Sequence, residues 1–318
     1  MDIVLNNLTN PTLLFFLLGI IATLVKSDLE IPPTTTKFIS LYLLFAIGFK
    51  GGQELAHGDF TAEIGFSLLF GLALATIIPI YTFFILRQKL NVFDSGAIAA
   101  AYGSVSAVTF VAASTFLELQ GLTFSGHMVA VMALMESPAI IAGVILIMLF
   151  NHGKEREHSF RSIVHHSFTN GSVLMIIGSL MIGLIADVRQ AEGIKPFTTD
   201  IFKGFLAIFL LEMGMVTAKR FNAFWKQGLF VVLFAIVVPA INGSLAALAS
   251  VWVTHDVGNR FLFAVLAASA SYIAVPAAMR LAAPKADPGL YIPMALAVTF
   301  PFNITIGMPL YLTIIESS

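Results

Sequence analysis

A succession of ten apolar segments runs through nearly the whole chain, and it constrains the fold more than any other feature. Each segment is close to the ~20 residues that an α-helix needs to cross the hydrocarbon core of a bilayer. The segments are Pro11–Val25, Phe38–Gly51, Ile64–Leu86, Gly96–Leu117, Met128–Phe150, Ser172–Ala186, Ile201–Val216, Leu229–Val253, Phe261–Leu281 and Leu290–Ile315. The sequence therefore predicts an all-α polytopic membrane protein, with one transmembrane domain spanning residues 1–318.

Composition supports this class and excludes several others. Only 11% of the residues are charged, whereas soluble domains carry about 25%. The chain contains no Cys, which excludes disulfides, thiolate nucleophiles and Cys-based metal sites. A net charge of −1 offers no basic surface for nucleic acid. No GxSxG, HExxH or glycine-rich phosphate loop is present, so we do not expect an enzyme. The first segment lacks the basic leader and cleavage site of a signal peptide, and we expect it to be a retained membrane helix.

The two halves of the chain look like repeats. Each half, about 11–150 and 171–316, holds five apolar segments, and a loop at about 151–170 joins them. Four features recur in the same order at offsets of about 160–166 residues: Pro79 and Pro239, Pro138 and Pro301, Ser104–Ser106 and Ser269–Ser271, and Gly48 and Gly214. Because five spans is an odd number, the second half must enter the membrane upside down. An inverted 5+5 repeat is typical of secondary transporters that alternate access around a midplane site.

The distribution of Lys and Arg predicts the orientation in the membrane. Of the 17 basic residues, twelve lie in the odd-numbered connections and five in the even-numbered ones. Because cytoplasmic loops are enriched in Lys and Arg, we expect both termini outside and the 151–170 loop in the cytoplasm. Four of the seven His residues crowd this loop without metal-site spacing. The loop fits a solvated connector, with a docking surface or pH sensor as the alternative.

Two serine-containing stretches, Gly103–Ala113 and Ala268–Arg280, interrupt the fourth and ninth segments with small residues. A helix broken there would begin again with unpaired N–H groups and a positive dipole end, which suits an anion. Close helix packing by small residues is the alternative, but matched interruptions in two halves favour a binding site. The predicted substrate-binding residues are Gly103, Ser104, Val105, Ser106, Ser269, Ala270, Ser271 and Tyr272. Neither serine cluster contains Lys or Arg, which favours a small, weakly bound anion.

Glu136 lies inside the fifth segment, in MALMESPAII. A carboxylate at this depth costs ~2.5–3.5 kcal/mol or more unless it is paired or binds a cation. The corresponding part of the second half supplies neutral oxygen ligands, so we predict a sodium site formed by Glu136, Thr109, Thr299 and Asn303. A protonated Glu136, hydrogen-bonded between helices, is the alternative. Glu212 has no helix-breaking neighbour, and we expect it to be structural or peripheral.

The stretches ASASYIAVPAAMRLAAPKADPGLY and AVTFPFNITIGMPLY, within 268–311, carry a resemblance to a known family. On these residues the chain resembles the sodium-dependent bicarbonate transporters first known from cyanobacteria. The resemblance implies a 5+5 inverted fold with gate and core domains, sodium-coupled bicarbonate uptake and usually a homotrimer. It also implies a bacterial inner-membrane location, surrounded by lipid, with a PII-like regulator on the cytoplasmic face.

Some residues depart from the family pattern. The first broken stretch of the family resembles GAVSGSTMAAA, which Gly103, Val105, Ser106 and Thr109 match. Ala107 and Val108 replace a glycine and a serine, Glu136 replaces an Asp of the cyanobacterial members, and the 151–170 loop is short. Lys50, Gln53 and Glu54 at the end of the second segment fit an interfacial anchor.

The leading hypothesis is a sodium-dependent symporter that imports bicarbonate by alternating access. The alternative within the same class is a proton- or sodium-coupled carrier of another small anion, with Glu136 as a proton relay. A membrane enzyme would need a nucleophile–base pair within the membrane, and the sequence offers none. A passive channel would not need broken helices in inverted repeats.

Overall fold

A computed structural model describes residues 11–56, 61–151, 171–225 and 228–318. All regular structure in these ranges is helical, which confirms the predicted all-α class. Except for Asn151, the predicted cytoplasmic loop and its four His residues lie outside the described residues.

Helices overlap each of the ten predicted apolar segments, although several of their ends differ from the predicted ones. The first half contains α2 (Pro11–Leu24), α3 (Pro33–Ala56), α4 (Ala62–Leu86), α5 (Val92–Gly103), α6 (Ala107–Leu119) and α7 (His127–Phe150). The second half begins with α9 (Gly171–Ile185), α10 (Val188–Glu192), the π-helical turn η1 (Pro196–Asp200), α11 (Phe202–Trp225), α12 (Leu229–Ala249) and the 3-10 turn η2 (Ser250–Trp252). It continues with α13 (Val257–Ala268), α14 (Ala274–Ala282) and a last long helical segment made of α15 (Pro288–Pro293), η3 (Met294–Thr299), α16 (Phe300–Phe302), η4 (Asn303–Gly307) and α17 (Met308–Glu316).

Six helical segments in the described residues are long and apolar enough to cross a membrane: Ala62–Leu86, Val92–Leu119, His127–Phe150, Pro196–Lys219, Leu229–Trp252 and Pro288–Glu316. Three shorter apolar helices accompany them, at Leu14–Leu24, Gly171–Ile185 and Val257–Ala268. This architecture fits a polytopic membrane protein.

Both predicted helix breaks are present. The chain leaves the helical conformation at Ser104–Ser106, between α5 and α6, and at Ser269–Ile273, between α13 and α14. Ser106 has extended backbone angles, and its hydroxyl accepts a hydrogen bond from the N–H of Thr109 at 3.1 Å. A serine N-cap of this kind stabilises a new helix start. Pro276 lies in the first turn of α14, where a missing N–H costs no helical hydrogen bond. Pro276 therefore does not interrupt a helix itself, and the second break consists of the non-helical residues Ser269–Ile273.

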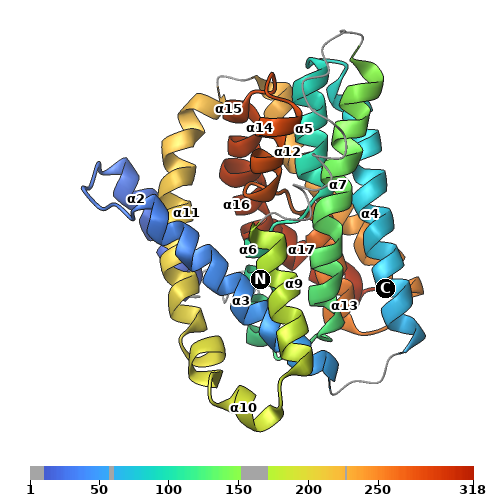
Figure 1. Cartoon of the computed structure of the whole chain (residues 1–318). Helices are drawn as coiled ribbons and strands as arrows, with labels where there is room; N and C mark the ends of the chain where they lie inside the picture. The colour runs from blue at the N-terminus through green and yellow to red at the C-terminus, as the bar shows by residue number, and fades with distance from the viewer. Residues whose placement is uncertain (1–10, 57–60, 152–170, 226–227) are drawn as a thin grey trace.

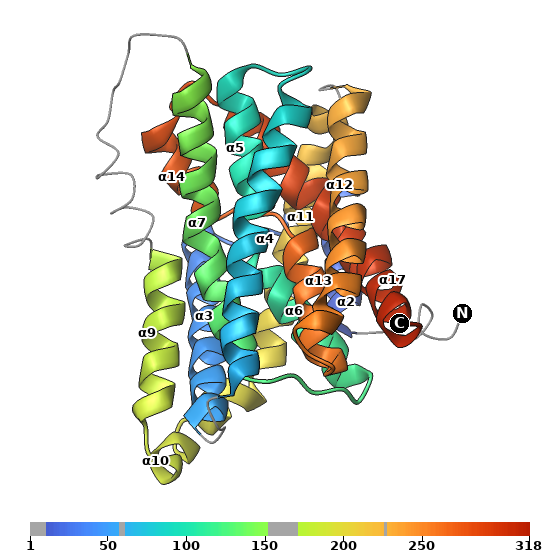
Figure 2. The ribbon, with the colours of Figure 1, turned by 90° about the vertical axis from the view of Figure 1, so that its right-hand side faces the viewer.

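The two broken helices run in opposite directions. In Figures 1 and 2, α5 begins at the upper end and α6 continues downward, whereas α13 begins at the lower end and α14 lies above it. The breaks meet in the middle of the molecule. There the N–H of Ser106 donates to Ser269 Oγ at 3.1 Å, and the N–H of Ser271 donates to the carbonyl of Ala101 at 2.8 Å.

The helices form two groups, which Figure 1 separates from left to right. In the paired group, α2 packs along α11 and α3 packs along α9. In the crossed group, α4 packs on α5 and α7, and α12 packs on α13 and α17, so that the broken helices lie inside it. Figure 2 shows the crossed group from its outer side.

Glycines bring the helices of the paired group into backbone contact. A Cβ added at Gly19 of α2 would lie 2.0 Å from the carbonyl oxygen of Leu211, and one at Gly214 of α11 would lie 2.0 Å from that of Phe16. The α3–α9 pair is built the same way: a Cβ at Gly52 would lie 2.1 Å from the oxygen of Leu180. Because lipid gives no hydrophobic drive for helices to associate, close packing of small residues supplies the attraction.

Candidate functional site

A small polar cavity lies between the two helix groups, at the point where the breaks meet. From the crossed group it is lined by Ser106, Glu136, Ser271 and Tyr272, together with apolar residues of the first α6 turns. From the paired group, α3 contributes Ser40 and α9 contributes Ser172. Its volume is about 20 Å³, which is room for about one water-sized species.

Half of the predicted substrate-binding residues line this cavity, namely Val105, Ser106, Ser271 and Tyr272. The other half, Gly103, Ser104, Ser269 and Ala270, are buried behind it. These four do not line the cavity and instead shape the break.

The two serines behind the cavity fix the broken backbone. Ser104 Oγ donates to the carbonyl of Glu136 at 3.2 Å, which ties the first break to α7. Ser269 Oγ donates to the carbonyl of Leu266 at 2.9 Å while it accepts from the N–H of Ser106. The Ser269 hydroxyl therefore satisfies backbone groups that the interruptions leave free, whereas the Ser104 hydroxyl joins the first break to the continuous helix α7.

Gly103 has a packing role. A Cβ added there would lie 2.1 Å from Cγ of Pro79, so α5 can approach α4 at this level only because residue 103 is a glycine. Gly103 therefore serves close helix packing, the alternative to a binding role, whereas Ser106 and Ser271 face the cavity.

Two helix starts point toward the cavity. Ala107 and Val108, the first residues of α6, line it, and so does Ile273, the residue before α14. The Ser271 hydroxyl accepts from the N–H of Val275 in the first turn of α14, at 3.4 Å. Helix starts carry a positive dipole end, and two of them flanking one cavity favour an anion.

The Tyr272 hydroxyl is buried and has Ser106 beside it. Within the described part of the chain it makes no hydrogen bond of ordinary geometry. Burying a hydroxyl without a hydrogen-bond partner costs about 1–3 kcal/mol of stability. The Tyr272 hydroxyl is therefore available to donate a hydrogen bond to a ligand in the cavity.

Glu136 is only 8% exposed, and its side chain faces the cavity. Helix α7 is continuous through Pro138, so the carboxylate is held by a regular helix. Among residues 11–56, 61–151, 171–225 and 228–318, no hydrogen bond or ion pair satisfies this carboxylate. Burial of an unpaired carboxylate is unfavourable, and a bound cation or a proton would relieve it.

The other predicted cation ligands lie elsewhere, and the structure does not bring them to the cavity. Thr109 is buried in the first turn of α6. Thr299 Oγ1 donates to the carbonyl of Ala235 at 2.7 Å, and lies 2.7 Å from the hydroxyl of Tyr102. Ala235 lies four residues before Pro239, which has no N–H to bond its carbonyl. Thr299 therefore replaces a missing helical hydrogen bond.

Asn303 holds the end of α13. Its amide donates to the carbonyl of Ala268 at 2.8 Å, and its side-chain oxygen accepts from the hydroxyl of Tyr311 at 3.2 Å. Thr299 and Asn303 thus contact the last turns of α5 and α13, through Tyr102 and Ala268, rather than Glu136.

Two of the cavity residues carry no sequence signal that would select them. Ser40 and Ser172 come from the paired group, in segments without a helix break. Single serines on apolar helices are equally common at packing contacts. Only the tertiary arrangement brings these two to the cavity.

A family model for the Na+-dependent bicarbonate transporter superfamily matches residues 11–316. The chain belongs to this superfamily. The match covers nearly the whole chain and confirms the resemblance carried by residues 268–311. None of the curated proteins matches the chain. Superfamily membership and the apolar helices together identify a multi-pass membrane protein of a transporter class.

Proposed function

We propose that this protein is a sodium-dependent symporter that imports bicarbonate across the bacterial inner membrane by alternating access. The observation that carries the proposal is the small cavity where the two breaks meet, with hydroxyl groups and the Glu136 carboxylate, unpaired within the described part of the chain, facing it. Superfamily membership supports sodium and bicarbonate as the transported species.

An inverted 5+5 repeat is part of the proposal. Under it, α2–α7 correspond to α9–α17, and the whole forms one transmembrane domain with both termini outside. Three observations support this correspondence. The helices before the breaks, α5 and α13, each contain 12 residues. The broken helices run in opposite directions. If α2 corresponds to α9 and α3 to α11, exchanging the two halves turns the α2–α11 pair into the α9–α3 pair, and both pairs are present.

In the proposed mechanism, bicarbonate binds between the starts of α6 and α14. The Tyr272 hydroxyl, with Ser106 and Ser271, donates hydrogen bonds to its oxygens. A cavity of about 20 Å³ is too small for an anion of four heavy atoms. We infer that the two helix groups separate slightly before the anion enters, and that the described conformation is the closed one.

Sodium binds at the Glu136 carboxylate in this mechanism, and Thr109, buried in the first turn of α6 outside the cavity, would have to move to supply a hydroxyl ligand. Two like charges about 4 Å apart repel by ~4 kcal/mol at an effective dielectric constant of about 20, roughly a thousandfold in affinity. The ionised carboxylate would therefore exclude bicarbonate until a cation neutralises it. This repulsion is a direct physical cause for coupling between the two ions.

Thr299 and Asn303 belong to a second proposed position for the cation. They contact the last turns of α5 and α13, and carbonyl-rich helix ends coordinate sodium in other transporters. Since their oxygens now make protein hydrogen bonds, ion binding there would require these bonds to exchange.

Uptake of labelled bicarbonate into proteoliposomes tests the function. We expect uptake to require an inward sodium gradient and to stop when choline replaces sodium. A panel of small anions, each added unlabelled, measures selectivity by competition. Uptake driven by a proton gradient without sodium would support the proton-coupled carrier instead, and absence of any gradient dependence would contradict both.

Assembly and regulation are the remaining parts of the proposal, and they come from the family resemblance. We expect a homotrimer, which native mass spectrometry in detergent would detect. A PII-like regulator would dock on the cytoplasmic face, where residues 152–170 lie outside the described structure. Pull-down with and without this loop would test that interaction.

A further inference from the structure

A second, larger cavity separates the same two helix groups. It has a volume of about 310 Å³, and we name it the vestibule. Helices α3 and α6 line both cavities: Leu43 and Val111 face the small one, while Lys50 and Glu118 face the vestibule. The vestibule therefore continues the interface from the small cavity toward the end of the molecule that carries α10 (Figure 1).

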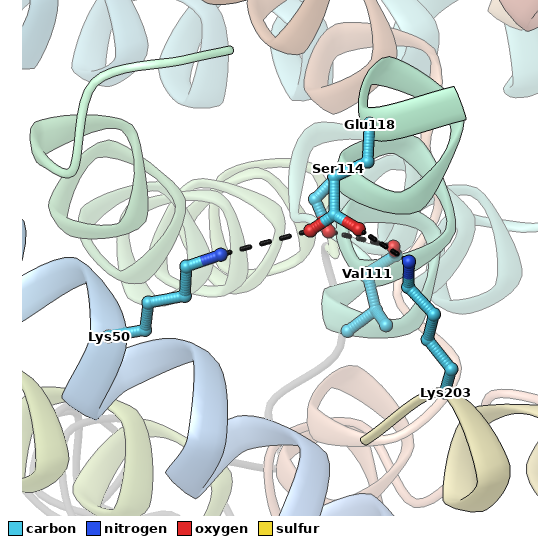
Figure 3. Close-up of polar contacts among 5 residues, drawn as sticks. All are labelled: Lys50, Val111, Ser114, Glu118 and Lys203. Carbon is cyan, nitrogen blue, oxygen red and sulfur yellow. Dashed lines mark hydrogen bonds and ion pairs between the residues drawn. The ribbon is translucent and has the colours of Figure 1, made fainter. Parts of the chain in front are cut away.

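One carboxylate joins the two groups across the vestibule. Glu118, in the last turn of α6, lies 2.9 Å from Nζ of Lys203 and 3.8 Å from Nζ of Lys50. Figure 3 shows the two lysines approaching the carboxylate from opposite sides. Lys50 belongs to α3 and Lys203 to the start of α11, so both cations come from the paired group. The anion comes from the crossed group.

We propose that Glu118, Lys50 and Lys203 form an ionic latch that holds the two helix groups together in this conformation and opens in each transport cycle. The latch rests on the proposed alternating access, in which the groups move relative to one another. A displacement of a few ångströms would separate both ion pairs, since each reaches only from one group to the other.

The exposure of the latch residues suits a reversible contact. Their side chains are 43–58% exposed, so water can replace each lost ion pair. Exposed ion pairs contribute little to stability. Glu54 and Asp200 also line the vestibule and offer the lysines other carboxylates when Glu118 moves away. The latch should therefore bias the conformational equilibrium about two- to fivefold without locking it.

Distances between two spin labels would measure this bias in the purified full-length protein. Trp252→Cys places a label on the crossed group and Gln190→Cys on the paired side, at exposed positions in a chain without native Cys. We expect one main distance in the parent. Glu118→Gln should increase a second distance population about two- to fivefold, whereas Glu192→Gln, an exposed acid of α10 at the same end, should not.

A charge-reversal variant and a salt titration distinguish an ionic latch from a local packing effect. The triple variant Glu118→Lys, Lys50→Glu and Lys203→Glu should restore the parental distances. Added choline chloride should populate the second distance in the parent but not in Glu118→Gln, because salt screens exposed charges. Identical distances and identical salt responses in Glu118→Gln and Glu192→Gln would overturn the latch. Absence of sodium-dependent uptake in the parent would instead overturn the proposed function, since the distance measurement does not depend on transport.

Discussion

At the scale of single residues, Glu136 is the group whose surroundings most need a ligand, because its buried carboxylate faces the cavity without a partner among the described residues. Glu136→Gln keeps the shape and removes the charge. We expect the sodium concentration for half-maximal uptake to rise at least tenfold, since a hydrogen bond or contact to a charged group is worth about 1.5–3 kcal/mol. Glu212→Gln in α11, away from the cavity, is the matched control. Unchanged sodium dependence would contradict the assignment, and a shifted pH dependence alone would favour a proton relay.

Tyr272 gives a second test at the same scale. Tyr272→Phe removes one hydroxyl and keeps the ring that packs 6.3 Å from the ring of Phe300. The hydroxyl has no protein partner of ordinary geometry within the described residues, so its loss should leave thermal stability unchanged or slightly higher. Bicarbonate affinity should fall about tenfold to a hundredfold if the hydroxyl binds the anion.

Ser271→Ala should weaken affinity similarly, whereas Ser179→Ala, a buried serine of α9 outside the cavity, should not. Ser106→Ala is less informative because Ser106 also caps α6. Parental affinity in both Tyr272→Phe and Ser271→Ala would show that the cavity binds no anion.

The sequence predicted part of the candidate site. Matched serines mark a pair of breaks, and Ser106 and Ser271 do face one cavity. What the sequence could not supply is the partner of each polar group. Thr299 has the oxygen chemistry of a cation ligand, yet its hydroxyl bonds the carbonyl that Pro239 leaves free. Whether the Thr299 hydroxyl binds a cation or a backbone carbonyl depends on how α12 and η3 pack, and a local sequence pattern does not predict that packing.

At the scale of helices, the α2–α11 contact predicts a strong dependence on glycine. Gly214→Ala would place a Cβ 2.0 Å from the carbonyl oxygen of Phe16, so the two helices would have to separate. Gly204→Ala is the matched control, because it lies in the same helix with open space around it. We expect Gly214→Ala to lower the melting temperature in detergent by several degrees, and Gly204→Ala to leave it unchanged or raise it. Equal melting temperatures would contradict the contact.

Hydropathy does not predict the ends of the helices, as the second segment shows. Phe38–Gly51 was the predicted second segment, but α3 runs from Pro33 to Ala56. Its polar end is used in tertiary contacts: Lys50 pairs with Glu118, and Gln53 donates to the carbonyl of Ala186 at 2.9 Å. These residues connect helices in addition to any role at the membrane interface. Hydropathy omits them because it scores polarity and not the partner that satisfies it.

At the scale of the whole molecule, the Lys and Arg distribution predicts which end faces the cytoplasm. Gln88 lies between α4 and α5, and Gln190 lies in α10 at the opposite end; both are exposed. In intact cells, we expect a membrane-impermeant maleimide to label Gln190→Cys and not Gln88→Cys, which should react only after permeabilisation. The chain has no native Cys to label. The reverse pattern would overturn the predicted orientation.

The pairing of helices across the two halves also has a consequence for biogenesis. Thr23 of α2 donates to the carbonyl of Met215 in α11, 192 residues further along the chain. At synthesis rates of about 5–20 residues per second, α2 waits on the order of 10–40 s in the membrane before its partner leaves the ribosome. During that time its glycine face lacks the α11 backbone against which Gly19 packs in the folded protein. Although α4, α5 and α7 can pack on one another within the N-terminal half, α2 lacks its main partner there, and quality control must tolerate an unpaired first helix until α11 has been synthesised.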